Sequence, residues 1–136
     1  MRRRSRRARR IVVSTRRKGS GGKYIITYKY PNNTKVEIRV KFPEKLEKIT
    51  RMFRNYLKAQ GISESTATHY VRAVRLLFAH YKRYPAENEV IEFALMYKVH
   101  GGASVLEAWE LFQKYLKDLD LADEVQGDGV VINPLW

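Results

Sequence analysis

The chain has 136 residues, a hydrophobic fraction of 44%, a formal net charge of +13 and no cysteine. This length and apolar content suffice for one small domain with an appendage. The absence of cysteine excludes disulfides and thiolate metal sites. No apolar run approaches the ~20 residues that a membrane-spanning helix needs, and the basic start lacks the apolar core of a signal peptide.

The positive charge is concentrated in the first third of the chain. Residues 1 to 41 carry 15 Lys and Arg against one acid, Glu37, whereas residues 42 to 136 carry 12 basic and 13 acidic residues. Such asymmetry predicts a polyanionic partner. Nucleic acid is the first expectation, because each neutralised phosphate releases counterions. A membrane surface would need an amphipathic basic helix or a second anchor, and the segment before Ile11 has no apolar face.

Residues 1–22 are predicted to be a basic arm. Its first ten residues, MRRRSRRARR, cannot bury apolar surface and are expected to be disordered in isolation. Arginines are drawn to phosphates and narrow minor grooves. The alternative is a localisation signal or a solubilising tail. The candidate nucleic-acid contacts in this segment are Arg2, Arg3, Arg4, Arg6, Arg7, Arg9 and Arg10.

Residues 11 to 42 read as β structure. A short apolar run, Ile11 to Val13, and a flexible stretch, Lys18 to Gly22, precede a hairpin over residues 23–42 with its turn at residues 31–34. Alternation places Tyr24, Ile26, Tyr28, Tyr30, Val36, Ile38, Val40 and Phe42 on one face, which can pack on the body of the protein. The opposite face is mostly basic. Further candidate contacts, with a merely solvated ribbon as the alternative, are Arg16, Arg17, Lys18, Lys23, Lys29, Lys35, Arg39 and Lys41.

The tyrosines of the hairpin have two interpretations. Tyr24, Tyr28 and Tyr30 could stack on bases. Their alternation along the strand favours packing in the core instead.

Residues 43–122 are predicted to form a helical domain, followed by a C-terminal tail, 123–136. The apolar tail is expected to dock on its own body or on a neighbour. The expected fold class is mainly α: a four-helix SAM-like bundle preceded by a basic N-terminal arm and a β-hairpin. The four helices are expected to run from Pro43 to Gly61, from Ser63 to Pro85, through Val90 and Tyr97 to Gly101, and from a capping box at Ser104 and Glu107.

The start of the second helix carries a family signature. The segment from Tyr56 through Gly61-Ile62-Ser63, with Thr66, Tyr70 and Arg75, resembles the core-binding domain of tyrosine recombinases of the phage-integrase type. The resemblance implies a small helical domain that half-encircles duplex DNA. In the family, a catalytic domain with an Arg, a His and a nucleophilic Tyr follows this domain. Because the sequence stops at Trp136, the resemblance implies DNA binding and recombination chemistry is not inferred from it.

The helices add fewer candidate sites than the arm. Arg72 and Arg75 lie one turn apart on the side of the second helix away from its apolar stripe. They are candidate phosphate contacts, with His69, Lys82 and Arg83 near that side and a solvated helix face as the alternative. The acidic run at residues 118–124 could hold a cation, but it favours contacts between subunits. No catalytic residue, metal site or cofactor is expected, because the three histidines lack metal-ligand spacing with acids.

The sequence therefore predicts a non-enzymatic, largely sequence-independent protein that binds and packages double-stranded DNA, of the viral nucleocapsid or nucleoid type. Its copies are expected to form homo- or hetero-oligomers along the DNA, in a virion or inside a cell, without a membrane partner. The many charged residues and the lack of cysteine favour a thermophilic source. Two alternatives stay open: an integrase-like accessory factor that recognises one DNA site, and an RNA-associated protein of the ribosomal type.

Overall fold

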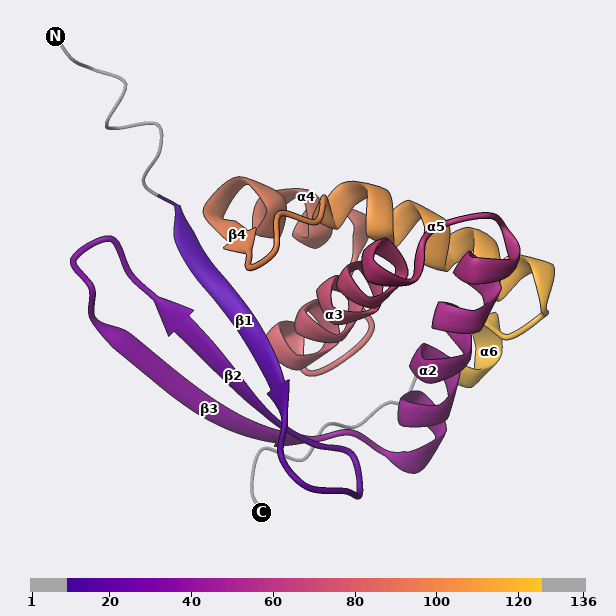
Figure 1. The fold of residues 1–136 in the computed structure, drawn as a ribbon, viewed down its shortest axis with the longest axis horizontal. Coiled ribbons are helices and arrows are strands. Elements are labelled where there is room, and N and C mark those ends of the chain that lie inside the picture. Colours follow the sequence, from indigo (N-terminus) through magenta and orange to yellow (C-terminus); the bar gives the residue numbers. More distant parts are fainter. Residues whose placement is uncertain (1–9, 126–136) are drawn as a thin grey trace, which may run out of the picture.

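In the computed structural model, which describes residues 10–125, the chain is an α/β fold (Figure 1). Four strands form one sheet, and five helices are present in the described part of the chain. The strands are β1 (Ile11–Arg17), β2 (Lys23–Lys29), β3 (Lys35–Lys41) and β4 (Tyr97–Val99). The helices are α2 (Glu44–Ala59), α3 (Glu64–Tyr81), α4 (Glu87–Met96), α5 (Val105–Asp118) and α6 (Ala122–Val125).

The expectation of a mainly α, SAM-like four-helix bundle preceded by a hairpin is wrong. The hairpin is part of a four-stranded mixed sheet with the order β3-β2-β1-β4. One hydrophobic core contains Val13 and Ile26 from the sheet together with Phe53, Phe78 and Phe112 from the helices. The sheet thus shares its core with the helices, and the fold is α/β.

The short strand β4 was not predicted from the sequence, and neither was the one-turn helix α6. Residues 97–99 were expected to continue the third helix, but α4 ends at Met96 and Tyr97–Val99 pair in parallel with Ile11–Val13. Tyr97 and Val99 pack against the core, whereas Lys98 is exposed. This pairing joins residues about 86 positions apart, so no local pattern indicates it.

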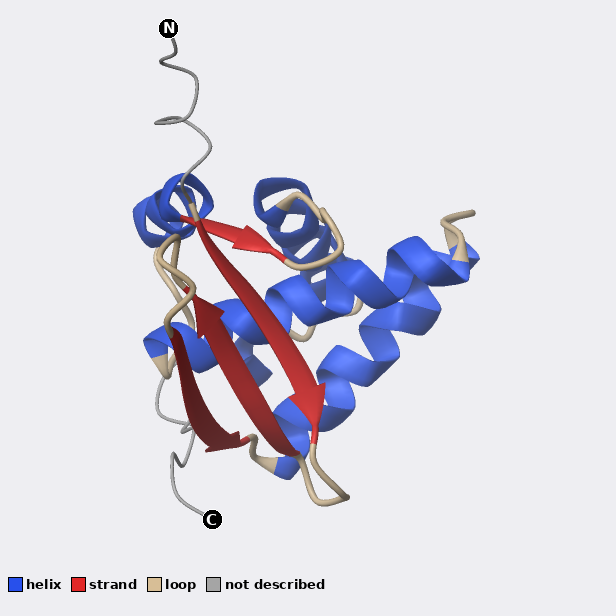
Figure 2. Cartoon of the chain, turned by 60° about the vertical axis from the view of Figure 1, so that its left-hand side comes forward, coloured by secondary structure: helices blue, strands red, loops and turns tan. Residues whose placement is uncertain are grey.

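The sheet has one face toward the helices, as Figures 1 and 2 show. Tyr24, Ile26 and Tyr28 on β2 and Val40 on β3 are all at least 92% buried. The predicted alternation is therefore confirmed at these positions. It fails toward the turn, where Tyr30 and Val36 are exposed. The strands flank the predicted turn, in which Asn33 has a φ of 73° and the Thr34 N–H donates to Asn32 Oδ1.

Strand β1 is paired on both sides only in its first half. It is antiparallel to β2 from Val12 to Arg17, but β4 pairs only with Ile11–Val13. In the described part of the chain, no strand lies beyond the half of β1 from Ser14 to Arg17. The helices α2 and α3 approach the sheet on this side, and a groove forms there.

Helix boundaries follow the predicted signals closely. Ser63 and Ser104 are N-caps, since their hydroxyls accept hydrogen bonds from the N–H groups of Thr66 and Glu107. Pro43 is the residue before α2 rather than its first helical residue. Helix α3 ends at Tyr81, where Lys82 adopts a left-handed φ of 61°, before Pro85 is reached. No helix in residues 10–125 is long and apolar enough to cross a bilayer.

Candidate nucleic-acid interface

The face of the sheet turned away from the helix core is strongly basic. We call it the outer face; its charged residues are Arg16, Lys23, Lys29, Lys35, Arg39, Lys41, Lys98 and one acid, Glu37. Side chains alternate between the two faces along a strand, and directly paired residues point to the same face. Each of these residues either neighbours a core residue along its strand or pairs with a residue of the outer face. All of them except Lys23 are exposed. Ile25 is also on this face, yet it is 95% buried beside its cross-strand neighbours Arg16 and Arg39.

Two pairs of lysines lie directly opposite each other on the outer face. Lys29 of β2 pairs with Lys35 of β3, and Lys23 pairs with Lys41. Like charges directly opposite across antiparallel strands destabilise a sheet. The strands therefore hold the lysines in an arrangement that an anion would stabilise.

A second basic feature is a concave site between β1, α2 and α3. We call it the arginine groove. It has a volume of about 550 Å³, and its lining residues are Thr15, Arg16, Arg17, Tyr24, Arg51, Arg54, Thr68, Val71, Arg72 and Arg75. Arg16 belongs to both the outer face and this groove. The two basic surfaces therefore meet at the half of β1 that pairs with β2 alone.

Three residues that line the arginine groove, Arg17, Tyr24 and Arg75, belong to an ionic cluster around Glu47, which lies behind them and outside the groove lining. Glu47 accepts a hydrogen bond from Arg17 Nη1 at 2.9 Å, and the Tyr24 hydroxyl lies 2.9 Å from both carboxylate oxygens. Arg75 Nη2 is 4.0 Å from Glu47, and its Nε donates to Thr50 Oγ1 at 3.1 Å. The guanidinium groups of Arg17 and Arg75 both lie over the Tyr24 ring, 5.2 and 5.1 Å from its centroid.

Burial shifts the pKa values of two groups in this cluster. It raises the pKa of Tyr24 to about 12, and the neighbouring Glu47 carboxylate acts in the same direction against Arg75 and Arg17. The Tyr24 hydroxyl therefore stays protonated at neutral pH and can donate to Glu47. Burial lowers the pKa of Arg75, which is partly offset by Tyr24 and Glu47. An arginine nevertheless remains charged in a folded protein.

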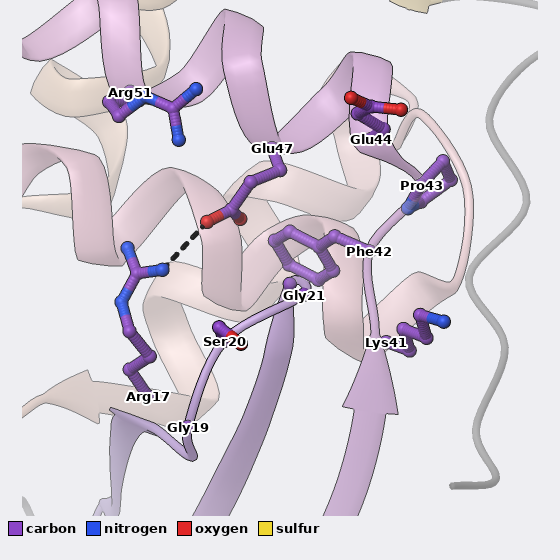
Figure 3. A pocket seen from close by; sticks show the side chains of 11 residues that line it. Arg17, Gly19, Ser20, Gly21, Lys41, Phe42, Pro43, Glu44, Glu47 and Arg51 are labelled. Atoms are coloured by element: carbon purple, nitrogen blue, oxygen red, sulfur yellow. Dashed lines mark hydrogen bonds and ion pairs between the residues drawn. The ribbon is translucent and has the colours of Figure 1, made fainter.

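A larger cavity of about 1060 Å³ adjoins the groove and shares Arg17 and Arg51 with it. Figure 3 shows Arg17 and Arg51 on one side of this cavity and Lys41 on the other, with Glu47 bonded to Arg17. The loop between β1 and β2, residues 19–22, also lines this cavity. Gly22 has a φ of 77°, and a Cβ there would lie 2.8 Å from the Phe42 carbonyl oxygen. The loop between β1 and β2 can therefore approach Phe42, the residue after β3, this closely only with glycine at position 22.

The structure brings only part of the predicted candidate set together. Arg16, Lys23, Lys29, Lys35, Arg39 and Lys41 share the outer face, while Arg17 joins Arg72 and Arg75 in the groove. Lys18 lies in the loop after β1. Arg10 is directed elsewhere, since its Nη1 donates to the Ala94 carbonyl near the end of α4 at 3.1 Å. Arg2, Arg3, Arg4, Arg6, Arg7 and Arg9, like the apolar tail from Gly127 to Trp136, lie outside the described residues.

Several predictions about single residues need correction. Arg75, expected on the polar side of its helix, is only 8% exposed because it reaches into the Glu47 cluster. Tyr24 and Tyr28 need none, since both are buried and the favoured core packing is confirmed for them, whereas Tyr30 is 37% exposed. Of the side chains expected near Arg72, Arg83 is instead paired with Glu89 at 2.6 Å.

The sequence analysis missed Arg51 and Arg54. They lie three residues apart on α2, as Arg72 and Arg75 do on α3, and the helical hairpin brings both pairs to one groove. This repeated spacing of arginines on two adjacent helices was the available signal. Lys98 was missed as well, because its place on the outer face depends on the unexpected strand β4.

Comparisons with known proteins identify no relative. No protein-family model, no curated protein and no solved structure matches the chain. Within residues 10–125, no group of three or more His, Asp or Glu side chains could hold a metal ion.

Proposed function

We propose that this chain is a non-enzymatic protein that binds and packages double-stranded DNA with little regard to sequence, as nucleocapsid and nucleoid proteins do. The observation that carries the proposal is that four lysines of the outer face lie opposite one another in two pairs. Lys29 pairs with Lys35, and Lys23 pairs with Lys41. The arginine-rich N-terminal segment would add phosphate contacts, and copies would assemble along the DNA.

The chemistry of the outer face supports backbone contact rather than base readout. Lys and Arg neutralise phosphates, and these contacts carry no sequence information. Asparagine and glutamine, which pair with adenine edges, are absent from all four strands. Readout of adenine by these strands is therefore not expected, and on the proposed function the lysines and arginines contact phosphates rather than guanine edges.

One observation favours a second candidate, an integrase-like factor that recognises a single DNA site. The segment Gly61-Ile62-Ser63, part of the recombinase-like pattern, connects α2 and α3, and the Ser63 hydroxyl caps α3. This candidate predicts strong discrimination between one cognate site and random DNA. An RNA-associated protein, the remaining alternative, predicts that structured RNA displaces duplex DNA.

The test is binding of the full chain to random-sequence duplex DNA, measured by fluorescence anisotropy. Lys29→Gln with Lys35→Gln removes one lysine pair from the outer face, and we expect the double variant to bind about tenfold more weakly. Lys114→Gln with Lys117→Gln makes the same change of charge on α5 and is the matched control, with affinity close to wild type.

Equal losses in the two double variants would mean that only total charge matters and would refute a role for the outer face. A preference of more than about a thousandfold for one duplex sequence would favour the site-specific candidate. Displacement of the duplex by structured RNA at equal nucleotide concentration would favour the RNA-associated one.

A further inference from the structure

We infer that the arginine groove is a discrete binding site for a phosphate group, and that the phosphate it takes belongs to the backbone of the bound nucleic acid. The second half of this inference rests on the function proposed above. The first half rests on the groove alone. The site is distinct from the outer face, with which it shares only Arg16.

The groove holds more positive charge than its own residues neutralise. Six arginines line it, and two carboxylates engage them: Glu47 with Arg17 and Arg75, and Glu64 with Arg54. Among the described residues, no ion pair reaches Arg16, Arg51 or Arg72. Like charges this close repel one another, so a bound anion would stabilise the folded chain.

Hydrogen-bonding groups also remain open in the groove. Thr15 Oγ1 and Arg54 Nε are buried and have no hydrogen-bond partner among the described residues. Buried polar atoms without partners are uncommon and call for an explanation. Both residues line the groove, so an acceptor bound there could take hydrogen bonds from the Thr15 hydroxyl and the Arg54 Nε–H.

The lining fits a phosphate group and does not fit a stacked base. Guanidinium groups bind phosphate with paired, charge-assisted hydrogen bonds. The aromatic ring of the groove, Tyr24, lies under Arg17 and Arg75 and is 2% exposed, so it offers no stacking surface. A volume of about 550 Å³ holds more than one phosphate group.

The position of the groove connects it to the nucleic-acid surface. It opens beside residues 15–17 of β1, the half of the strand that has no further strand beside it in residues 10–125. A backbone that contacts the outer face at Arg16 can therefore continue into the groove without crossing the sheet.

Inorganic pyrophosphate tests the first half of the inference, by calorimetric titration and by thermal unfolding at constant ionic strength. The groove variant is Arg51→Gln with Arg72→Gln, because both side chains are exposed and unpaired among the described residues. Its matched control is Lys114→Gln with Lys117→Gln, which removes the same charge from α5, outside the groove and the outer face. We expect pyrophosphate to bind and stabilise the wild type and the control, and to bind the groove variant at least tenfold more weakly.

The same variants test the second half with labelled duplex DNA. The groove variant should bind the duplex at least fivefold more weakly than the wild type. Pyrophosphate should weaken binding of the wild type to the duplex, at matched ionic strength, and have little further effect on the groove variant.

Equal pyrophosphate binding by all three proteins, or none by the wild type, would overturn the groove as a phosphate site. Normal duplex affinity of the groove variant would overturn the assignment to a backbone phosphate. Failure of the proposed function would look different, since the outer-face variant would then bind duplex DNA as tightly as the wild type.

Discussion

Glu47 is the carboxylate that pairs with two arginines of the groove lining, Arg17 and Arg75. Its side chain is 10% exposed and accepts hydrogen bonds from Arg17 and Tyr24, and Arg75, buried to the same extent, is the second cation beside it. Two guanidinium groups thus share one carboxylate. Such a cluster tolerates the loss of its only acid poorly, because a buried charge without a partner is costly.

Glu47→Gln is therefore expected to destabilise the fold by about 3 kcal/mol, since it leaves the buried Arg75 without a counter-ion. Urea unfolding at neutral pH measures this change. The control is Glu64→Gln, which removes an exposed partner of Arg54 and should cost less than about 1 kcal/mol. A Glu47→Gln variant as stable as the control would show that Arg75 does not depend on Glu47.

Single residues also mark the limit of what the sequence predicts. Arg75 has the spacing of a solvated arginine, and only packing of α3 against β2 and α2 reveals that it is buried. Arg51 and Arg54 likewise resemble an ordinary polar helix face. They become groove residues because α2 packs beside α3 and the edge of β1.

At the scale of elements, Tyr28 and His80 join the sheet to the helices. The Tyr28 hydroxyl of β2 lies 2.9 Å from His80 Nδ1 of α3. The imidazole also contacts the rings of Tyr81, Phe93 and Tyr97. Burial lowers the pKa of His80 below its ordinary value of 6.5, and the charge of Lys82 acts in the same direction.

This shift makes stability depend on pH. The unfolded chain takes up a proton at His80 at a higher pH than the folded chain does, so stability is greatest above pH 6.5 and falls as the pH drops from 6.5 through the folded pKa. His80→Gln should flatten the change in unfolding free energy between pH 8 and pH 5.5. His100→Gln, at an exposed position, is the control and should keep it. An unchanged profile in the His80→Gln variant would contradict this assignment.

Elements specified by local signals were predicted well, and those specified by distant pairing were not. The hairpin turn, the N-caps Ser63 and Ser104 and the stop before Gly61 are all encoded within a few residues, and the structure has them in place. Strand β4 is three residues long and exists only because Ile11–Val13 offer a partner. The prediction lacked this strand and the four-stranded sheet to which it belongs, so a helical bundle was expected instead of an α/β fold.

At the scale of the whole molecule, basic and acidic residues lie in two different parts of the described chain. The boundary falls near residue 83 rather than at residue 41. Residues 10 to 83, which include the sheet, α2 and α3, carry 18 Lys and Arg against four Glu. Residues 84 to 125, which include α4, α5 and α6, carry three Lys against nine acids. Residues 42 to 136 are therefore near neutral only in total. The helices α2 and α3 belong to the basic half of the described chain, residues 10 to 83, and α4, α5 and α6 belong to the acidic half.

This division should orient the protein on a polyanion. The arginine groove and, apart from Lys98, the outer face lie within residues 10 to 83, and phosphates would repel the acidic helices. Contacts between neighbouring copies are then expected on the acidic side, where Glu and Asp could meet the basic half of the next copy.

The salt dependence of binding to random-sequence duplex DNA tests the central claim most directly. Six or more phosphate contacts predict that the affinity of the full chain falls by roughly a thousandfold between 50 and 200 mM salt, because each contact releases counterions. The logarithmic slope should become shallower by about two in the Lys29→Gln, Lys35→Gln variant. An affinity that changes little with salt, or a slope that the double variant leaves unaltered, would contradict phosphate binding by the outer face.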